Sequence, residues 1–435
     1  MAMHHRREIF GWAMYDWANS AFYTTVVTTF FGPYLARLAE ARGGTVEVFG
    51  IAIHGAAFYP LLFASSVIVQ VLLLPILGAI ADFSPLKKSF MLTFAYVGAL
   101  CTVGLFWVDS QRIVFGGLLF SLANLCFGAA LVFYNAFLPA IAAPNERDAV
   151  SSQGFACGYV GGGLLLLGNL FLVSVLADKG LAVRLSLASA GVWWLVFTFL
   201  FPQWRLQERQ PISTLPPGKT YVGYGFTQLR HTLTELVRHY PRTLLFLLAF
   251  LLYNDGIQTV IVVATLFAAS ELRIDTGTQV QVVLMIQFVA VFGALAFHRL
   301  AACWGAKKAI LLNLGLWTGL VLYAYAYLYT VAQFWVLGAI VAVILGGAQA
   351  LSRSLFSHLI PRQREAAYFS LYEISDRGTA WVGKVVFGIA VQITGSQRVA
   401  LLALIVFFGL GMVLLWCTDV PRAIREAGNE VPAVV

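Results

Sequence analysis

Long apolar stretches follow one another along almost the whole chain, separated by short polar segments. A helix that crosses the hydrocarbon core of a bilayer takes about 20 residues, and most of these stretches are that long. Because the bilayer core offers the backbone no hydrogen-bond partners, they are expected to be helical. The pattern predicts an all-α membrane protein with twelve transmembrane helices, at residues 9–35, 51–81, 89–108, 113–139, 150–176, 182–201, 243–269, 279–299, 308–329, 331–357, 366–393 and 398–417.

The first apolar stretch carries a polar stripe. Its members, Asp16, Asn19, Ser20 and Tyr23, have the i, i+3, i+4, i+7 spacing of one helix face. An ionised aspartate at the centre of a spanning helix costs roughly 2.5–3.5 kcal/mol, so it should face protein or a water-filled cavity. We interpret the stripe as a substrate or proton site. The alternative is a polar cluster that locks two helices together.

The seventh stretch repeats this pattern with Asp255, Gln258 and Thr259, preceded by Asn254. Two further segments recur in the same order, since 78–88 resembles 293–308 and 144–149 resembles 361–366. Two sets of six spans related by a repeat are the layout of one large transporter fold, whose substrate site lies between the halves. We therefore expect both stripes to face one cavity, with helix packing as the alternative for the second stripe.

One long connection separates the two sets of spans. It opens with several prolines, which favour irregular chain, and ends in a segment with apolar residues on one helical face, as expected for a helix on the membrane surface. The predicted organisation is an N-terminal six-helix half at 1–201, a cytoplasmic linker with an amphipathic helix at 202–242, a C-terminal six-helix half at 243–420 and a cytoplasmic tail at 421–435.

Lys and Arg are concentrated in the loops on one side of the predicted membrane. Because positively charged loops stay in the cytoplasm, this bias predicts that both termini are cytoplasmic. The same assignment predicts that Arg353, near the end of the tenth stretch, reaches the cytoplasmic surface.

Composition supports a membrane protein, because 60% of the 435 residues are hydrophobic and only 11% are charged, against about 25% charged in soluble domains. The net charge of +8 could suggest nucleic acid, but the Lys and Arg lie at helix ends and no soluble domain is present to hold them. The five cysteines are single, the histidines are scattered, and motifs of hydrolases or metalloproteases are absent. We expect no enzyme activity, no cofactor and no metal site.

Several motifs resemble known families. The segment Gly78-x-x-x-Asp82, followed by Lys87 and Lys88, resembles the loop signature of the major facilitator superfamily. Longer motifs are similar to the bacterial and fungal family related to the vacuolar amino-acid effluxer of autophagy: YDWANSAFY at 15–23, GFACGYVGGG at 154–163, YNDGIQT at 253–259, GGAQALSRS at 346–354 and LYEISDRGT at 371–379. This resemblance spans nearly the whole chain. It implies the transporter fold and amino acids as substrates, and it makes Asp82 part of a cytoplasmic gate.

The eleventh stretch has the most charges. Glu373, Arg377 and Lys384 lie close to one helical face, and Asp376 is turned away by about 60–100°. Glu373 and Arg377 are spaced to pair along the helix. Such mixed charges suit a zwitterionic substrate, and they suit equally a gate that opens and closes with a salt bridge. We favour the gate for Glu373, Asp376 and Arg377, and substrate binding for Lys384.

The sequence thus predicts a secondary active transporter of a small polar metabolite, with amino acids favoured by resemblance. Proton coupling through Asp16 or Asp255 is a hypothesis, since a buried carboxylate can take up and release a proton. A drug, sugar or nucleoside carrier is an alternative, and a non-transporting membrane sensor or scaffold is an alternative of another class. We expect a monomer in a bacterial inner membrane, or in a vacuolar membrane if the source is eukaryotic.

Overall fold

The computed structural model describes residues 2–48, 50–208, 221–362, 364–377 and 381–434. The first part of the predicted linker, residues 209–220, lies outside these ranges. The first group of helices, called the N-terminal group below, consists of α1 (Ala2–Ala21), the π-helix η1 (Phe22–Phe30), α2 (Phe31–Glu40), α3 (Gly55–Asp82), α4 (Lys87–Gly104), α5 (Ile113–Ile141), α6 (Arg147–Val175), α7 (Lys179–Leu200) and α8 (Pro202–Arg205).

Helix α9 (Tyr221–Arg238) leads to the second group, called the C-terminal group below. It consists of α10 (Pro241–Ser270), α11 (Thr276–Trp304), α12 (Ala306–Tyr327), α13 (Val331–His358), α14 (Glu365–Arg377), α15 (Val382–Thr394), α16 (Gln397–Leu401) and α17 (Leu404–Cys417), and α18 (Val420–Glu426) follows. Three short 3-10 turns, η2 (Leu105–Trp107), η3 (Ser110–Arg112) and η4 (Pro144–Glu146), complete the helical elements of the described ranges.

Ten helices of the described chain are long and apolar enough to cross a membrane. The other two predicted spans lie on interrupted segments. Residues 9–35 extend over α1, η1 and α2, and residues 366–393 extend over α14 and α15 with the undescribed residues 378–380 between them. The all-helical membrane class is therefore confirmed, while the number twelve stays a prediction.

The π-helical turns in the first segment have local causes. The carbonyl of Thr24 accepts hydrogen bonds from the hydroxyls of Thr28 (2.6 Å) and Thr29 (2.7 Å), and that of Val27 accepts one from the Tyr59 hydroxyl (2.5 Å). Side chains that compete for carbonyls in this way loosen the α-helical ladder. Such π-helical turns are frequent at functional sites, and this one directly follows the polar stripe of α1.

The predicted start of the second span at residue 51 is wrong. Residues Ile51–His54 form strand β2, which pairs in antiparallel fashion with β1 (Thr45–Val48). Helix α3 begins only at Gly55, whose N–H donates to the Gly44 carbonyl (2.9 Å). The strand and the helix are equally apolar, so hydrophobicity alone could not separate them.

A capping box lies between the apolar stretches 308–329 and 331–357, which only Thr330 separates. The hydroxyl of Thr330 accepts from the N–H of Gln333 (3.3 Å), and the Gln333 side chain accepts from the Thr330 N–H (2.9 Å). This reciprocal pair satisfies free donors at the start of α13. Only three residues separate the end of α12 at Tyr327 from the start of α13 at Val331.

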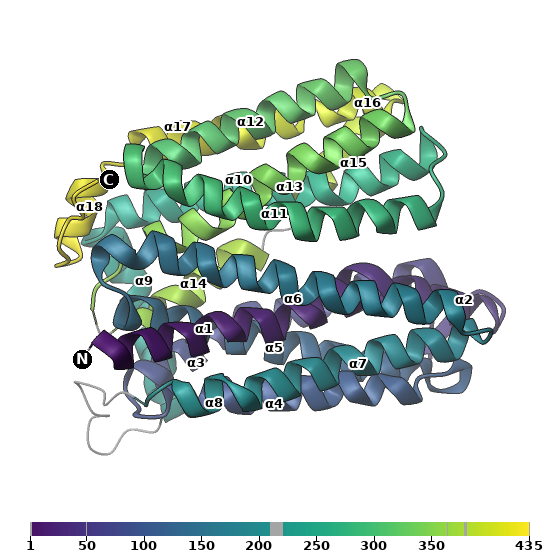
Figure 1. Cartoon of the computed structure of the whole chain (residues 1–435), viewed down its shortest axis with the longest axis horizontal. Helices are drawn as coiled ribbons and strands as arrows, with labels where there is room; N and C mark the ends of the chain where they lie inside the picture. Colours follow the sequence, from purple (N-terminus) through teal and green to yellow (C-terminus); the bar gives the residue numbers. More distant parts are fainter. Residues whose placement is uncertain (1, 49, 209–220, 363, 378–380, 435) are drawn as a thin grey trace.

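The N-terminal and C-terminal groups lie side by side, with both chain termini at the same end of the molecule (Figure 1). We call this the terminal end. Helix α6 packs against α11 and α13, and α3 and α5 pack against α14. These pairs form the boundary between the groups.

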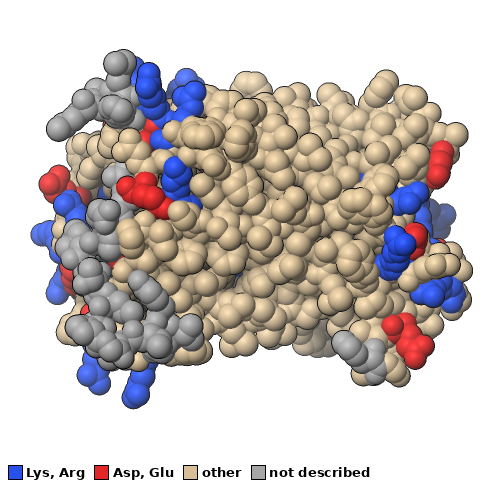
Figure 2. Space-filling model, turned by 90° about the horizontal axis from the view of Figure 1, so that it is seen from below, with Lys and Arg blue, Asp and Glu red and all other residues tan. Residues whose placement is uncertain are grey.

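Charged residues gather at the two ends of the molecule and leave an uncharged belt between them on the face seen in Figure 2. Large apolar side chains are exposed on the long helices, for example Leu72 of α3 at 65%, Phe171 of α6 at 68% and Phe292 of α11 at 71%. Exposed apolar surface of this extent is expected where lipid, not water, surrounds the protein. The chain is therefore a multi-pass membrane protein.

Candidate substrate-translocation site

The glycines of α6 allow α1 to approach it closely. A Cβ at Gly154 would lie 2.7 Å from an Asp16 carboxylate oxygen, and one at Gly158 would lie 2.6 Å from the Ser20 hydroxyl. A Cβ at Gly161 would lie 2.5 Å from the Trp17 carbonyl oxygen. Small residues at helical spacing permit such close contact in membranes. Part of the predicted polar stripe therefore faces a neighbouring helix.

Asp16 is buried and forms an ion pair across the boundary. One of its carboxylate oxygens accepts from the Tyr134 hydroxyl (2.7 Å) and lies 3.3 Å from a guanidinium nitrogen of Arg353. Tyr134 belongs to α5 and Arg353 to α13, so the pair joins the N-terminal and C-terminal groups. A charged residue in a membrane helix usually pairs in this way, because the isolated charge is costly.

The predicted surface position of Arg353 is wrong, since only 3% of this residue is exposed. Its guanidinium donates to the Ser151 hydroxyl (2.9 Å) and carbonyl (2.8 Å), and its carbon lies 4.7 Å from the Trp12 ring and 4.2 Å from the Phe155 ring. The position of Arg353 near the end of an apolar stretch had suggested that its side chain reaches the cytoplasmic surface. The aromatic rings and serine that hold the side chain belong to distant parts of the sequence.

Asn135 connects this pair to the charges of α14. Its side-chain oxygen accepts from Arg353 (3.4 Å), and its side-chain nitrogen donates to Glu373 (2.7 Å). Glu373 pairs in turn with Arg377 (3.3 Å), as their spacing predicted. The guanidinium of Arg377 lies 4.7 Å from the Phe127 ring centre. The result is a continuous polar network across the boundary.

Asp376 lies on another side of α14, where its carboxylate accepts from the side-chain nitrogen of Asn254 on α10 (2.7 Å). Tyr23 is 36% exposed, and its ring lies 6.2 Å from that of Phe127. Electrostatic interaction couples the Tyr23 hydroxyl to Asp376 and Arg377. Tyr23, Phe127 and the charges of α14 therefore lie close together at the boundary between the two groups.

Asp255 has different surroundings from Asp16. Its carboxylate accepts from the N–H of Gly383 (2.7 Å), in the first turn of α15, and it interacts electrostatically with Lys384. A Cβ at Gly383 would lie 2.3 Å from the Thr259 hydroxyl oxygen. The carboxylate thus caps a helix N-terminus, where a negative charge is favourable.

The two polar stripes are therefore placed unequally. In the first, Asn19 is buried and its side-chain nitrogen has no hydrogen-bond partner within the described ranges, while Ser20 is half-buried. In the second, Gln258 is half-buried and Thr259 is buried. The described contacts assign no partner shared by Asp16 and Asp255.

A second set of contacts closes the boundary near the terminal end. The two carboxylate oxygens of Asp82 accept from the N–H groups of Ala366 (3.0 Å) and Ala367 (2.8 Å), which begin α14. Lys87 lies 3.6 Å from Asp82 and 3.3 Å from Glu365. Asp82 satisfies free donors of the helix, so α3 is held at the N-terminus of α14.

Arg147 adds a further contact that the sequence did not single out. Its guanidinium donates to the Ser357 carbonyl (2.8 Å) on α13 and to the Pro139 carbonyl (3.2 Å) on α5. Tyr134 and Arg353 were also missed as members of the site, whereas Asn135, as a polar residue inside the fourth apolar stretch, is a weaker candidate from the sequence alone. The only available signal for Arg353 was a basic residue inside an apolar stretch.

Within the described ranges, no group of three or more His, Cys, Asp or Glu side chains is placed to hold a metal ion. The arrangement instead offers paired charges and aromatic walls at a boundary between two helix groups. Such an arrangement suits binding and conformational change.

The fold is that of the major facilitator superfamily of transporters. It is similar to the E. coli fucose:proton symporter FucP, with a TM-score of 0.65 and 13% identity over 95% of this chain and 98% of that one. It is equally similar to the proton:xylose symporter XylE, with a TM-score of 0.66 and 11% identity over 95% and 94% of the two chains. Within this class, the chain belongs to the vacuole effluxer Atg22-like family, whose model matches residues 4–428.

Two curated relatives are similar over nearly their whole length. An uncharacterized MFS-type transporter of Bacillus subtilis, YxiO, is 30% identical over 97% of both chains. Autophagy-related protein 22-1 of Penicillium rubens is 25% identical over 97% of this chain and 91% of its own. The resemblance inferred from the motifs is therefore confirmed, and fold and family both point to a transporter, not an enzyme.

Proposed function

We propose that the protein is a secondary active transporter of amino acids that works by alternating access. Twelve spans would form two six-helix halves, 1–201 and 243–420, joined by the linker 202–242 and followed by the tail 421–435. The interrupted segments α1–η1–α2 and α14–α15 would supply the first and eleventh spans. Support comes from their position, since both contribute charges to the polar network at the boundary.

Both termini would be cytoplasmic, in a bacterial inner membrane. The bias of Lys and Arg supports this orientation. Asp82, Arg147 and Arg353 join the two helix groups near the terminal end. In this orientation these contacts would close the substrate path to the cytoplasm. Opening to the cytoplasm requires these contacts to break.

The observation that carries the substrate proposal is the charge arrangement around Tyr23. Arg377 offers a cation for a carboxylate, and Glu373 and Asp376 offer anions for an ammonium group, beside the exposed ring of Tyr23 and that of Phe127. A zwitterion needs both charges at once. The same residues serve as the gate, because a substrate that pairs with Arg377 competes with its bond to Glu373.

Asp16, Asn19, Ser20, Asn254, Asp255, Gln258, Thr259 and Lys384 would contribute to coupling or to the lining of the path. Protonation of Asp255 would weaken its cap on α15 and its attraction to Lys384. We expect Asp255→Asn to abolish transport driven by a pH gradient and to leave exchange intact. Full pH dependence in this variant would remove Asp255 from the coupling step.

Ligand binding tests the substrate class. The thermal unfolding of purified protein in nanodiscs is measured without ligand and with leucine, xylose, a nucleoside or a cationic drug. A ligand present at 100 times its Kd stabilises the folded state by about 2.7 kcal/mol. Stabilisation by leucine that Arg377→Gln loses would support the proposal. Stabilisation by one of the other ligands alone would replace amino acids with that class.

A further inference from the structure

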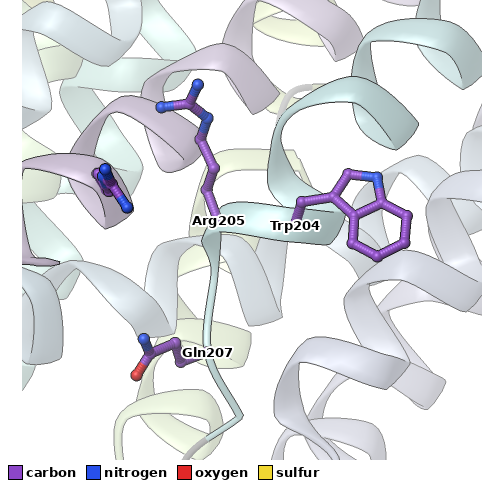
Figure 3. A pocket seen from close by; sticks show the side chains of 4 residues that line it. Trp204, Arg205 and Gln207 are labelled. Atoms are coloured by element: carbon purple, nitrogen blue, oxygen red, sulfur yellow. The ribbon is translucent and has the colours of Figure 1, made fainter.

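A pocket of about 440 Å³ lies beside α8, near the terminal end of the N-terminal group (Figure 1, Figure 3). It is lined by Arg7 of α1, Trp204 and Arg205 of α8, and Gln207. Two guanidinium groups therefore share one small concave site. The transport cycle proposed above assigns no role to it.

The Arg205 guanidinium is held by aromatic rings. Its central carbon lies 4.8 Å from the Phe10 ring centre and 5.8 Å from that of Phe201, and these two rings pack edge-on at 5.5 Å. Stacking of this kind uses the face of the guanidinium and leaves its N–H groups available. Those N–H groups donate to no acceptor in the described part of the chain.

Arg7 supplies a second free cation. It is exposed, and its side chain makes no hydrogen bond or ion pair within the described ranges. Glu8, the neighbouring acid, is only 6% exposed, and its carboxylate accepts from the backbone N–H of Gln207 (3.1 Å). Glu8 does not line the pocket, so both arginines face it without a compensating carboxylate among the lining residues.

One wall of the pocket continues into the apolar belt. Trp204 is 69% exposed and packs edge-on against Phe199 at 5.8 Å, and Phe199 and Leu200 of α7 are 46% and 50% exposed. Tryptophan is enriched where the hydrocarbon core meets the headgroups. Exposed apolar side chains thus adjoin the two arginines, as a site at the level of the lipid headgroups would require.

We propose that this pocket binds the headgroup phosphate of an anionic phospholipid in the leaflet at the terminal end. The N–H fork of Arg205 matches the geometry of a phosphate, and Arg7 adds a second positive charge. The acyl chains lie against Trp204 and Phe199. Because Arg7 is on α1 and Arg205 on α8, the bound lipid connects the first helix of the protein to the end of the N-terminal group.

The test uses the full chain in detergent, titrated with phosphatidylglycerol or phosphatidylcholine and analysed by native mass spectrometry. We expect preferential retention of phosphatidylglycerol, an affinity about 5-fold lower in Arg7→Gln, and about 25-fold lower when Arg205→Gln is added. Arg112→Gln, an exposed arginine at the opposite end, is the matched control and should retain wild-type affinity.

Equal retention of both lipids, or unchanged affinity in Arg7→Gln, would overturn the proposal. Inorganic phosphate is added as a competitor. If millimolar phosphate displaces the lipid, the site belongs to a soluble phosphate compound and the lipid assignment fails. Arg205→Gln also removes the stacking of Arg205 on Phe10, which could impair folding of the double variant. In that case the single variant Arg7→Gln decides, because the Arg7 side chain is exposed and its replacement should not affect folding.

Discussion

The ion pair between Asp16 and Arg353 makes the sharpest prediction. Replacing Arg353 by Gln removes this pair and the bonds to Ser151, and it leaves the Asp16 carboxylate with the Tyr134 hydroxyl as its described partner. The side chains of Arg353 and Asp16 are only 4% and 10% exposed, so water screens the pair little. Breaking a buried pair by removing one partner costs about 3–5 kcal/mol.

The loss destabilises the conformation in which the terminal end is closed, because only in that conformation does the pair join the two helix groups. At the lower value of about 3 kcal/mol, the ratio of open to closed molecules should rise by roughly 150-fold. Spin labels on cysteines at Glu146 and Lys308, which are exposed near the terminal end of the two groups, report the distance between the groups. The five native cysteines are replaced beforehand.

The expected result is a shift to longer distances in Arg353→Gln, with Arg112→Gln unchanged. The double variant Asp16→Asn, Arg353→Gln should shift less, because no unpaired charge remains buried. A distance distribution in Arg353→Gln that matches the wild type would refute the assignment of this pair as a contact that closes the terminal end.

Two other predictions concern packing and the end of α3. Gly161→Ala should lower the free energy of unfolding by about 1–3 kcal/mol, because the added Cβ would lie 2.5 Å from the Trp17 carbonyl oxygen. Gly168→Ala on the same helix is the matched control, since a Cβ there would have nothing within 4 Å. Equal thermal unfolding of the two variants would contradict the close contact of α1 and α6. Asp82→Asn should also lengthen the distance between the labels. The N–H groups of Ala366 and Ala367 each donate to a different oxygen of Asp82, and in asparagine one of these two oxygens is replaced by a donor nitrogen. Unchanged distances would exclude Asp82 from closure.

Periodicity and apolar length predicted the elements well, because lipid imposes both on spanning helices. They also predicted the Glu373–Arg377 pair, which depends only on spacing along one helix. They failed at residues 51–54, where a strand is as apolar as the helix after it.

The site was less predictable, because its contacts join distant segments. The ion pair of Asp16 with Arg353 and the bond from Asn135 to Glu373 connect residues more than 200 positions apart. Nothing in the local pattern around Asn135 or Arg147 specifies a partner. A single sequence shows which polar residues are costly in a membrane, and only the folded arrangement shows how each is satisfied.

Counterflow in proteoliposomes tests transport itself most directly. Vesicles are preloaded with unlabelled amino acids and offered labelled leucine, with wild type, Asp16→Asn, Arg377→Gln and the control Arg112→Gln compared side by side. The account predicts uptake by the wild type and the control, and loss of uptake in the other two variants. No uptake by folded wild-type protein that binds leucine would contradict a carrier and would favour a sensor or scaffold on a transporter fold.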